Sequence, residues 1–101
     1  MSRRAARVDA NHGEIVAEFR RLGCAVESLA GMGKGVPDLL VCMHGRNELV
    51  EVKTEKGKLT EDQVKWFAKW PAPVHVVRST EDVAQLVRWA ELMSQGRKHE
   101  S

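Results

Sequence analysis

The chain has 101 residues, enough for one domain with a single modest core, so a second domain is not expected. Hydrophobic residues make up 43% and charged residues 30%, and no apolar run approaches the roughly 18 residues of a membrane span, which predicts a soluble globular protein. A net charge of +2 excludes a strongly basic protein that coats DNA, but not an enzyme whose positive side chains gather on one face.

The two cysteines, Cys24 and Cys42, each lie among apolar residues. They show neither the CxxC spacing of a zinc site nor the cysteine density of a secreted disulfide scaffold. The arginines near the N-terminus are not followed by an apolar stretch, so no secretory signal is expected. These features predict reduced core thiols in a cytoplasmic protein.

The N-terminal third of the chain predicts an arm, a helix and a strand. Residues 1–10 are polar, arginine-rich and without periodicity, which predicts a flexible basic arm, either disordered or in contact with phosphates. Apolar residues then recur at helical spacing over about residues 11–22, and Gly23 follows as a stop signal. Residues 24–29 alternate weakly and predict a first strand.

A glycine-rich loop is expected over residues 31–35, which include three glycines and Lys34. Glycines let the backbone come close to another group, here a nucleic-acid phosphate. The loop lacks the Gly-Lys-Ser/Thr sequence that opens a helix in nucleoside triphosphatases, so no nucleotide cofactor is expected.

Two apolar runs, at about residues 38–43 and 48–54, predict adjacent strands joined by a hairpin. With Gly45-Arg46 as a two-residue loop that has glycine at its first central position, His44 pairs with Asn47. A four-residue loop in the same register gives the same pairing.

Two acids and a lysine lie within these apolar runs, where charge is costly unless a metal or a partner compensates it. In the register above, Asp38 lies opposite Lys53 and one diagonal step from Glu51, so all three side chains project from one face. Two carboxylates suffice for Mg²⁺ when a substrate phosphate completes the shell. We therefore expect Asp38 and Glu51 to bind a divalent cation, with the carbonyl of Val52 as an additional ligand.

Three further side chains are candidates for the same centre. Lys53 would stand close to the attacking water, where its ammonium either orients the nucleophile or stabilises developing negative charge. Gln63 borders the apolar face of the next predicted helix, which aims it toward the sheet. Glu14 could supply a third carboxylate, although the helix dipole alone also favours an acid in a first helical turn.

The rest of the chain completes a single domain over residues 11–93. A capping box that begins at Thr60 opens a second helix, and two prolines end it. Residues 74–77 predict a fourth strand, a third helix follows, and residues 94–101 read as a polar tail.

Lysines surround the expected site in the sequence and could contact successive phosphates, although those on the second helix could equally be its solvated face. The tryptophans have helical spacing and are expected in the core, with Trp70 as the one candidate for stacking on a base. The candidates for nucleic-acid binding are Lys34, Lys56, Lys58 and Lys65.

An ordered set of motifs resembles the VRR-NUC branch of the PD-(D/E)XK nuclease superfamily. The motifs are Gly35-Val36-Pro37-Asp38, Glu51-Val52-Lys53 and Gly57-Lys58-Leu59-Thr60, followed by Gln63 and Trp66. The resemblance covers about residues 11–80 and is closest to the short stand-alone members of phages and bacteria. It implies an α/β, restriction-endonuclease-like core with a mixed sheet flanked by helices, in the order α-β-β-β-α-β-α.

The resemblance also implies cleavage of DNA that depends on Mg²⁺ or Mn²⁺. Stand-alone relatives are similar to Holliday-junction resolvases and act as homodimers, which implies structured or branched DNA as substrate and a homodimer in a bacterial or phage-infected cell. His12 lies where related sequences often carry a glutamine. Carried over by position, the metal ligands are Asp38 and Glu51, the catalytic lysine is Lys53, the helix-borne motif residue is Gln63 and the acid of the first helix is Glu14.

The sequence therefore predicts a small endonuclease that hydrolyses DNA phosphodiester bonds. Two alternatives stay open: a nucleic-acid-binding module that keeps this fold without catalysis, and a subunit of a larger DNA-processing complex. The intact acids and lysine favour catalysis.

Overall fold

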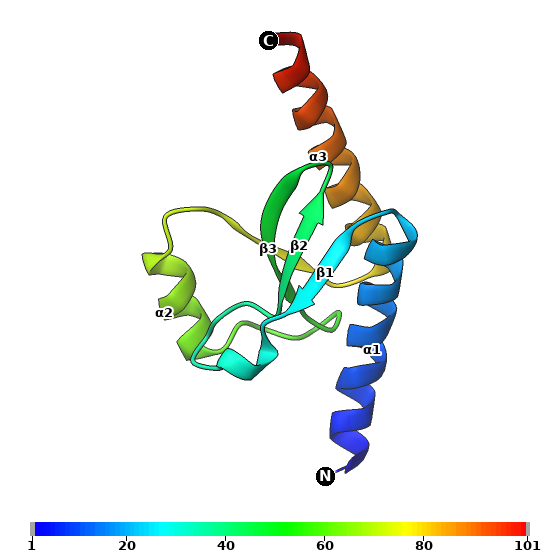
Figure 1. The fold of residues 1–101 in the computed structure, drawn as a ribbon. Helices are drawn as coiled ribbons and strands as arrows, with labels where there is room; N and C mark the ends of the chain where they lie inside the picture. The colour runs from blue at the N-terminus through cyan, green and yellow to red at the C-terminus, as the bar shows by residue number, and fades with distance from the viewer. Residues whose placement is uncertain (1, 101) are drawn as a thin grey trace.

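The computed structural model describes the backbone of residues 2–100 and the side chains of residues 11–96. Its elements follow the predicted order α-β-β-β-α-β-α (Figure 1). The helices are α1 (Ser2–Arg21), α2 (Glu61–Lys69) and α3 (Thr80–Glu100), and the strands are β1 (Ala25–Ser28), β2 (Leu39–Met43), β3 (Arg46–Val52) and β4 (Val74–Val77). A short 3₁₀ helix, η1 (Ala30–Met32), lies between β1 and β2.

The four strands form one mixed sheet in the order β1-β2-β3-β4. The first three strands are antiparallel neighbours, and β4 runs parallel to β3. A parallel pair needs a crossover connection, and the segment that contains α2 provides it. The predicted mixed sheet flanked by helices is confirmed.

Helices α1 and α3 pack together against one face of this sheet (Figure 1). Every second residue of β2 is buried, as expected for a strand with one covered face. On α1, Ile15 and Phe19 are four residues apart and both fully buried, so one stripe of the helix meets the strands. The core consists of Ile15, Phe19, Cys24, Leu39, Val41, Met43, Val50, Val77, Val83, Val87 and Ala90.

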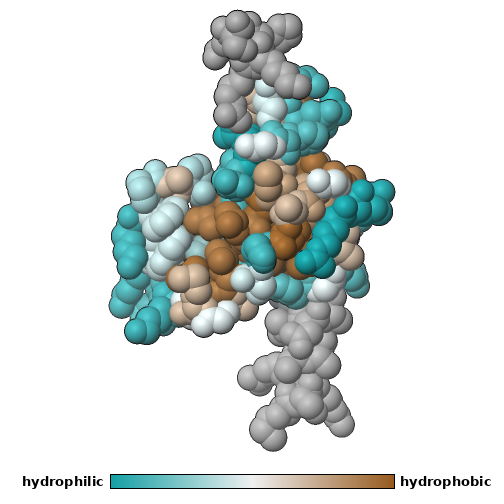
Figure 2. Space-filling view, in the orientation of Figure 1, coloured by the Kyte–Doolittle hydropathy of each residue, from teal (hydrophilic) through white to brown (hydrophobic). Residues whose placement is uncertain are grey.

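The opposite face of the sheet is only partly covered. Helix α2 lies on this side, apart from the two long helices, and none of its nine residues is buried. Leu40 is 36% exposed, and Figure 2 shows apolar side chains gathered over the strands between α2 and the long helices. Trp66 is half-buried and stacks on Trp70, so the prediction that Trp66 belongs to the core is wrong.

The hairpin between β2 and β3 turns one residue earlier than predicted. The loop is His44-Gly45, with φ of 50° and 80°, and Met43 pairs with Arg46. Two positive φ angles are typical of a type I′ turn, whose twist matches that of the flanking strands. The predicted Gly45-Arg46 loop is wrong because His44 adopts the left-handed conformation that the prediction reserved for glycine.

The earlier turn moves the register by two residues. Leu39 pairs with Val50, so the next position along places Asp38 opposite Glu51 instead of opposite Lys53. Side chains alternate along a strand, and a shift of two therefore leaves each residue on its predicted face. The expected convergence of the two acids survives the error in the loop.

Both long helices extend beyond their predicted bounds. Helix α1 begins at Ser2 rather than near residue 11, and α3 continues to Glu100. Alanine and arginine favour helix, which accounts for the longer α1. The side chains of the predicted arm at 1–10 and of residues 97–101 lie outside the described residues. Within the described residues, no helix is both long enough and apolar enough to cross a membrane.

Candidate active site

Asp38 and Glu51 are tied to each other through the backbone. The Asp38 N–H donates to Oε1 of Glu51 (3.2 Å), and the Val52 N–H donates to Oδ2 of Asp38 (3.0 Å). Each bond joins the residue just before β2 to the end of β3, so the hairpin register itself sets the position of both carboxylates. The predicted pair of acids on one face of the sheet is brought together.

Glu51 is a buried acid with a raised pKa. Its side chain is only 2% exposed, and Oε2 accepts from Nε2 of Gln63 (2.7 Å) and lies 3.5 Å from Nζ of Lys53. Burial is the main cause that raises the pKa of this carboxyl, and the charge of Asp38 raises it further against the opposing effects of Lys53 and Gln63. When both acids are ionised, their two negative charges are opposed by the single positive charge of Lys53.

The cap of α2 orients Gln63 toward Glu51. Thr60 Oγ1 accepts from the Gln63 N–H (3.2 Å), and Gln63 Oε1 accepts from the Thr60 N–H (2.9 Å), which confirms the predicted capping box. Because the cap occupies the amide oxygen, the amide nitrogen is left to face Glu51. The predicted approach of Gln63 to the site is therefore observed, and its cause is the cap.

Lys53 follows β3 directly and is also held by its backbone. Its N–H donates to the carbonyl of Val77 on β4 (3.0 Å), and its carbonyl accepts from Nδ2 of Asn11 on α1 (3.4 Å). The lysine side chain is 14% exposed. Sequence reasoning missed Asn11, yet Asn11 lies four and eight residues before the buried Ile15 and Phe19, and a polar residue on such an inward stripe was a usable signal.

A cavity of about 370 Å³ opens beside the acids. Its volume falls within the range of ordinary ligand sites and is ample for a phosphodiester group. Parts of α1, the end of β1, η1 and the end of β3 form its walls. The lining residues are Asn11, His12, Ser28, Ala30, Asp38, Val52 and Thr54.

The oxygen atoms at this cavity suit a hard divalent cation. Asp38 and Val52 line the cavity, and Glu51 is bonded to the Asp38 backbone. The N–H and C=O of one strand residue point to the same side, so the Val52 carbonyl shares the side of its N–H, which bonds Asp38. Among the described residues no three His, Cys, Asp or Glu side chains converge. Two carboxylates and a carbonyl nevertheless fit Mg²⁺ or Mn²⁺ when water and substrate phosphate complete the shell.

Among the described residues, Glu14 does not join Asp38 and Glu51 in a three-carboxylate group. It is exposed on α1 and does not line the cavity, whereas Asn11 and His12 do. Residues on a helix are separated by about 100°, so Glu14 lies about that far round α1 from the buried Ile15. His12 and Asn11 together bring α1 into the cavity wall.

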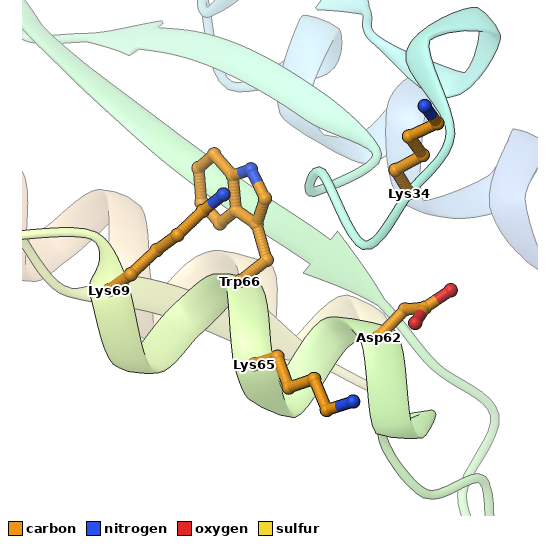
Figure 3. A pocket seen from close by; sticks show the side chains of 5 residues that line it. All are labelled: Lys34, Asp62, Lys65, Trp66 and Lys69. Atoms are coloured by element: carbon orange, nitrogen blue, oxygen red, sulfur yellow. The ribbon is translucent and has the colours of Figure 1, made fainter.

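The predicted DNA-binding lysines fall into two groups. Lys34, from the glycine loop, and Lys65, from α2, line a groove of about 350 Å³ together with Asp62, Trp66 and Lys69 (Figure 3). Lys56 and Lys58 are exposed on the connection between β3 and α2 and line neither the groove nor the cavity.

Arg78 braces the connection between Lys53 and α2. Its Nη1 donates to the carbonyls of Thr54 (2.8 Å), Glu55 (3.4 Å) and Gly57 (2.6 Å). The guanidinium thus hydrogen-bonds the carbonyls of the turn that leads from β3 to the cap of α2. Sequence reasoning missed Arg78, since no local pattern links a residue after β4 to a turn more than twenty positions earlier.

A mixed sheet that gathers two carboxylates, a lysine and a helix-borne amide at the end of a hairpin is the architecture of a nuclease-type α/β domain. Comparison with known proteins identifies the family within this class. The family model for the VRR-NUC domain matches residues 4–81, and the chain belongs to the VRR-NUC family. A solved structure titled "VRR_NUC domain" is 33% identical, covers 80% of this chain and 94% of its own, and superposes with a TM-score of 0.60. A search of curated proteins finds no match.

Proposed function

We propose that this protein is a metal-dependent endonuclease that hydrolyses DNA phosphodiester bonds with Mg²⁺ or Mn²⁺. Membership of a nuclease-type family supports a DNA nuclease role in general. The observation that carries the finer proposal is the buried Glu51, joined to Asp38 through the backbone and destabilised as an anion by burial and by that neighbour. A cation at this position offsets both costs.

Asp38, Glu51 and the carbonyl of Val52 would hold the cation, which, when bound, neutralises phosphate charge and lowers the pKa of a bound water. Lys53 lies beside Glu51, where its ammonium orients the attacking water or stabilises negative charge on the phosphate. Gln63 holds the Glu51 carboxylate in place from α2. Helix α2 therefore contributes to the site by positioning an acid.

The proposed substrate is structured or branched DNA, as the resemblance to stand-alone VRR-NUC proteins suggests. The positive charge that would bind its backbone comes from Lys34, Lys56, Lys58 and Lys65, all of them exposed. Phosphate contacts of this kind give affinity that falls with salt and depends little on sequence.

We also propose a homodimer, because one chain of 101 residues offers one set of acids, and cutting both strands of a branched DNA takes two. The partly covered sheet face that carries Leu40 supports this proposal. Light scattering on the full chain should give twice the monomer mass, and Leu40→Glu should shift the population toward monomer. A monomeric wild-type chain at working concentration would contradict the proposal.

A cytoplasmic location in a bacterial or phage-infected cell is proposed on the state of the cysteines. Cys24 is buried, Cys42 is half-buried, and both are free thiols. Free thiols, one of them in the core, are typical of a reducing compartment.

The test is a cleavage panel of linear, nicked, flapped and four-way DNAs with Mg²⁺, Mn²⁺, Ca²⁺ or a chelator. We expect cutting with Mg²⁺ or Mn²⁺ that Asp38→Ala and Lys53→Ala abolish while the circular dichroism spectrum is retained. DNA binding without cutting of any form would favour the non-catalytic module. Inactivity on every substrate together with a stable co-purifying protein would favour a subunit of a larger complex.

A further inference from the structure

We propose that the groove between the glycine loop and α2 binds an unpaired nucleotide of the DNA substrate, with its base on Trp66 and its phosphates beside the lysines. The proposal rests on the proposed nuclease function and names the feature of the substrate that the enzyme recognises. It concerns single-stranded DNA next to the cleavage site, as in a flap, a gap or an opened junction.

The groove combines an aromatic side chain with excess positive charge. Lys34 projects from the loop on one side, and α2 provides Lys65 and Lys69 on the other, with Trp66 between them (Figure 3). Three lysines against the single acid Asp62 leave a net lining charge of +2. Single-strand binding sites use this combination, because every base has a π-face and every nucleotide carries a phosphate.

The Trp66 ring is already fixed in place. It stacks on Trp70 with a centroid distance of 4.5 Å and an interplanar angle of 19°, and it meets Phe67 edge-on at 6.3 Å. A ring held in this way loses little further freedom when a base stacks on it. Trp70 remains 42% exposed, so the aromatic pair is open to a ligand.

A purely structural role does not account for these aromatics. Helix α2 buries none of its residues, and neither Trp66 nor Trp70, which follows the helix, belongs to the buried core. Exposed tryptophan is uncommon unless a partner covers it. The lysines around Trp66 disfavour an apolar protein partner. They favour a polyanion that carries aromatic bases.

Both walls of the groove are continuous in the chain with residues of the active site. Trp66 lies one helical turn after Gln63, whose amide holds Glu51. Lys34 lies four residues before Asp38, on the loop in which Gly35 approaches the backbone of Asp62. A strand whose unpaired nucleotide fills the groove is therefore held by the two segments that carry Gln63 and lead to Asp38.

Duplex DNA fits this groove less well, because its bases are stacked on one another and present no free face. The lysines would still contact duplex phosphates, but no base would stack on Trp66. The structure therefore predicts a preference for single-stranded over double-stranded oligonucleotides, which phosphate contacts alone would not produce.

The experiment is fluorescence anisotropy with a labelled short oligothymidine and a duplex of equal length, in chelator so that no cleavage occurs. We expect wild type to prefer the single strand, and Trp66→Ala to weaken single-strand binding by about 5- to 150-fold, the range of one lost stacking contact. Duplex binding should change less than about 2-fold. Trp66→Phe should retain most of the affinity, since it keeps a ring.

Two controls separate the groove from the chemistry. Asp38→Ala should keep the preference for the single strand over the duplex while losing cleavage, so failure of the groove and failure of the nuclease give different results. Lys56→Ala, outside the groove, should lower single-strand and duplex binding alike. If Trp66→Ala does not fold, Trp66→Leu, which keeps an apolar side chain without an aromatic ring, replaces it. Unchanged single-strand affinity in the folded groove variant, or a wild-type preference for duplex, would overturn the proposal.

Discussion

Gly35→Ala should destabilise the protein by pushing α2 away from the glycine loop. Gly35 has φ of +86°, a conformation that costs a residue with a side chain roughly 1–2 kcal/mol. The added Cβ would lie 2.3 Å from the carbonyl oxygen of Asp62 and 2.6 Å from its carbon, which are backbone atoms that yield only if the helix moves. Overpacking of this kind adds about 1–3 kcal/mol. The expected loss of unfolding free energy is therefore about 2–5 kcal/mol.

The displacement should also reach the active site. The same Cβ would lie 3.1 Å from the backbone nitrogen of Gln63, whose amide holds Glu51. Urea denaturation measures the change in stability, and cleavage of a flapped DNA with Mg²⁺ measures the change in activity. Because 1 kcal/mol moves the Tm of a domain of this size by roughly 4–8 °C, the fall in Tm should be about 10 °C or more.

Two other glycine substitutions separate the cost of the backbone conformation from the cost of overpacking. Gly23 has φ of +89° with nothing within 4 Å of an added Cβ, so Gly23→Ala should cost only the conformational part, about 1–2 kcal/mol. Gly31 has neither a positive φ nor a close neighbour, so Gly31→Ala should stay within about 0.5 kcal/mol of wild type. If Gly35→Ala loses no more stability than Gly23→Ala, the close approach of the loop and α2 is refuted.

Substitutions at three more positions test the groups around the acids. The pKa of Glu51 is raised in the folded state, so the stabilising effect of this carboxyl is full below its unfolded pKa and is lost as pH rises through its folded pKa. Glu51→Gln should therefore unfold at a higher urea concentration than wild type at pH 7 to 8 in chelator, and this gain should vanish in acid. The variant should not cleave DNA. Equal or lower stability at pH 8 would contradict the assigned cost of burial. Arg78→Ala should lower the unfolding free energy by about 2 kcal/mol, and Arg78→Lys should not restore it, because an ammonium is more strongly hydrated than a guanidinium and lacks its rigid planar shape. Thr60→Ala should cost about 1 kcal/mol of stability and also slow cleavage, since the cap orients Gln63; a variant with full activity would show that the cap has no such role.

The candidate site could be predicted because it depends on local patterns that tolerate small errors. Strand alternation identified the shared face of Asp38 and Glu51, and a register error of two residues left that face unchanged. The capping box at Thr60 defined the start of α2 and, with it, the position of Gln63. Both signals are local, because each depends only on residues that are close together in the sequence.

The parts that could not be predicted depend on contacts between distant segments. Helical periodicity shows that α2 has an apolar face, but not whether the sheet covers it, and Trp66 was therefore misassigned to the core. The start of α1 was placed nine residues too late, and periodicity alone did not reveal that Asn11 and His12, rather than Glu14, face the cavity. The brace by Arg78 joins segments 21 to 24 residues apart and has no local signature.

The most direct test of the account is a crystal structure of the protein with DNA and Mn²⁺, in which anomalous scattering locates the metal. The account predicts a manganese ion that contacts Asp38, Glu51 and the carbonyl of Val52, with a DNA phosphate completing its shell beside Lys53. A metal held elsewhere, or two carboxylates that keep their backbone hydrogen bonds and leave the manganese unbound in the presence of DNA, would contradict it.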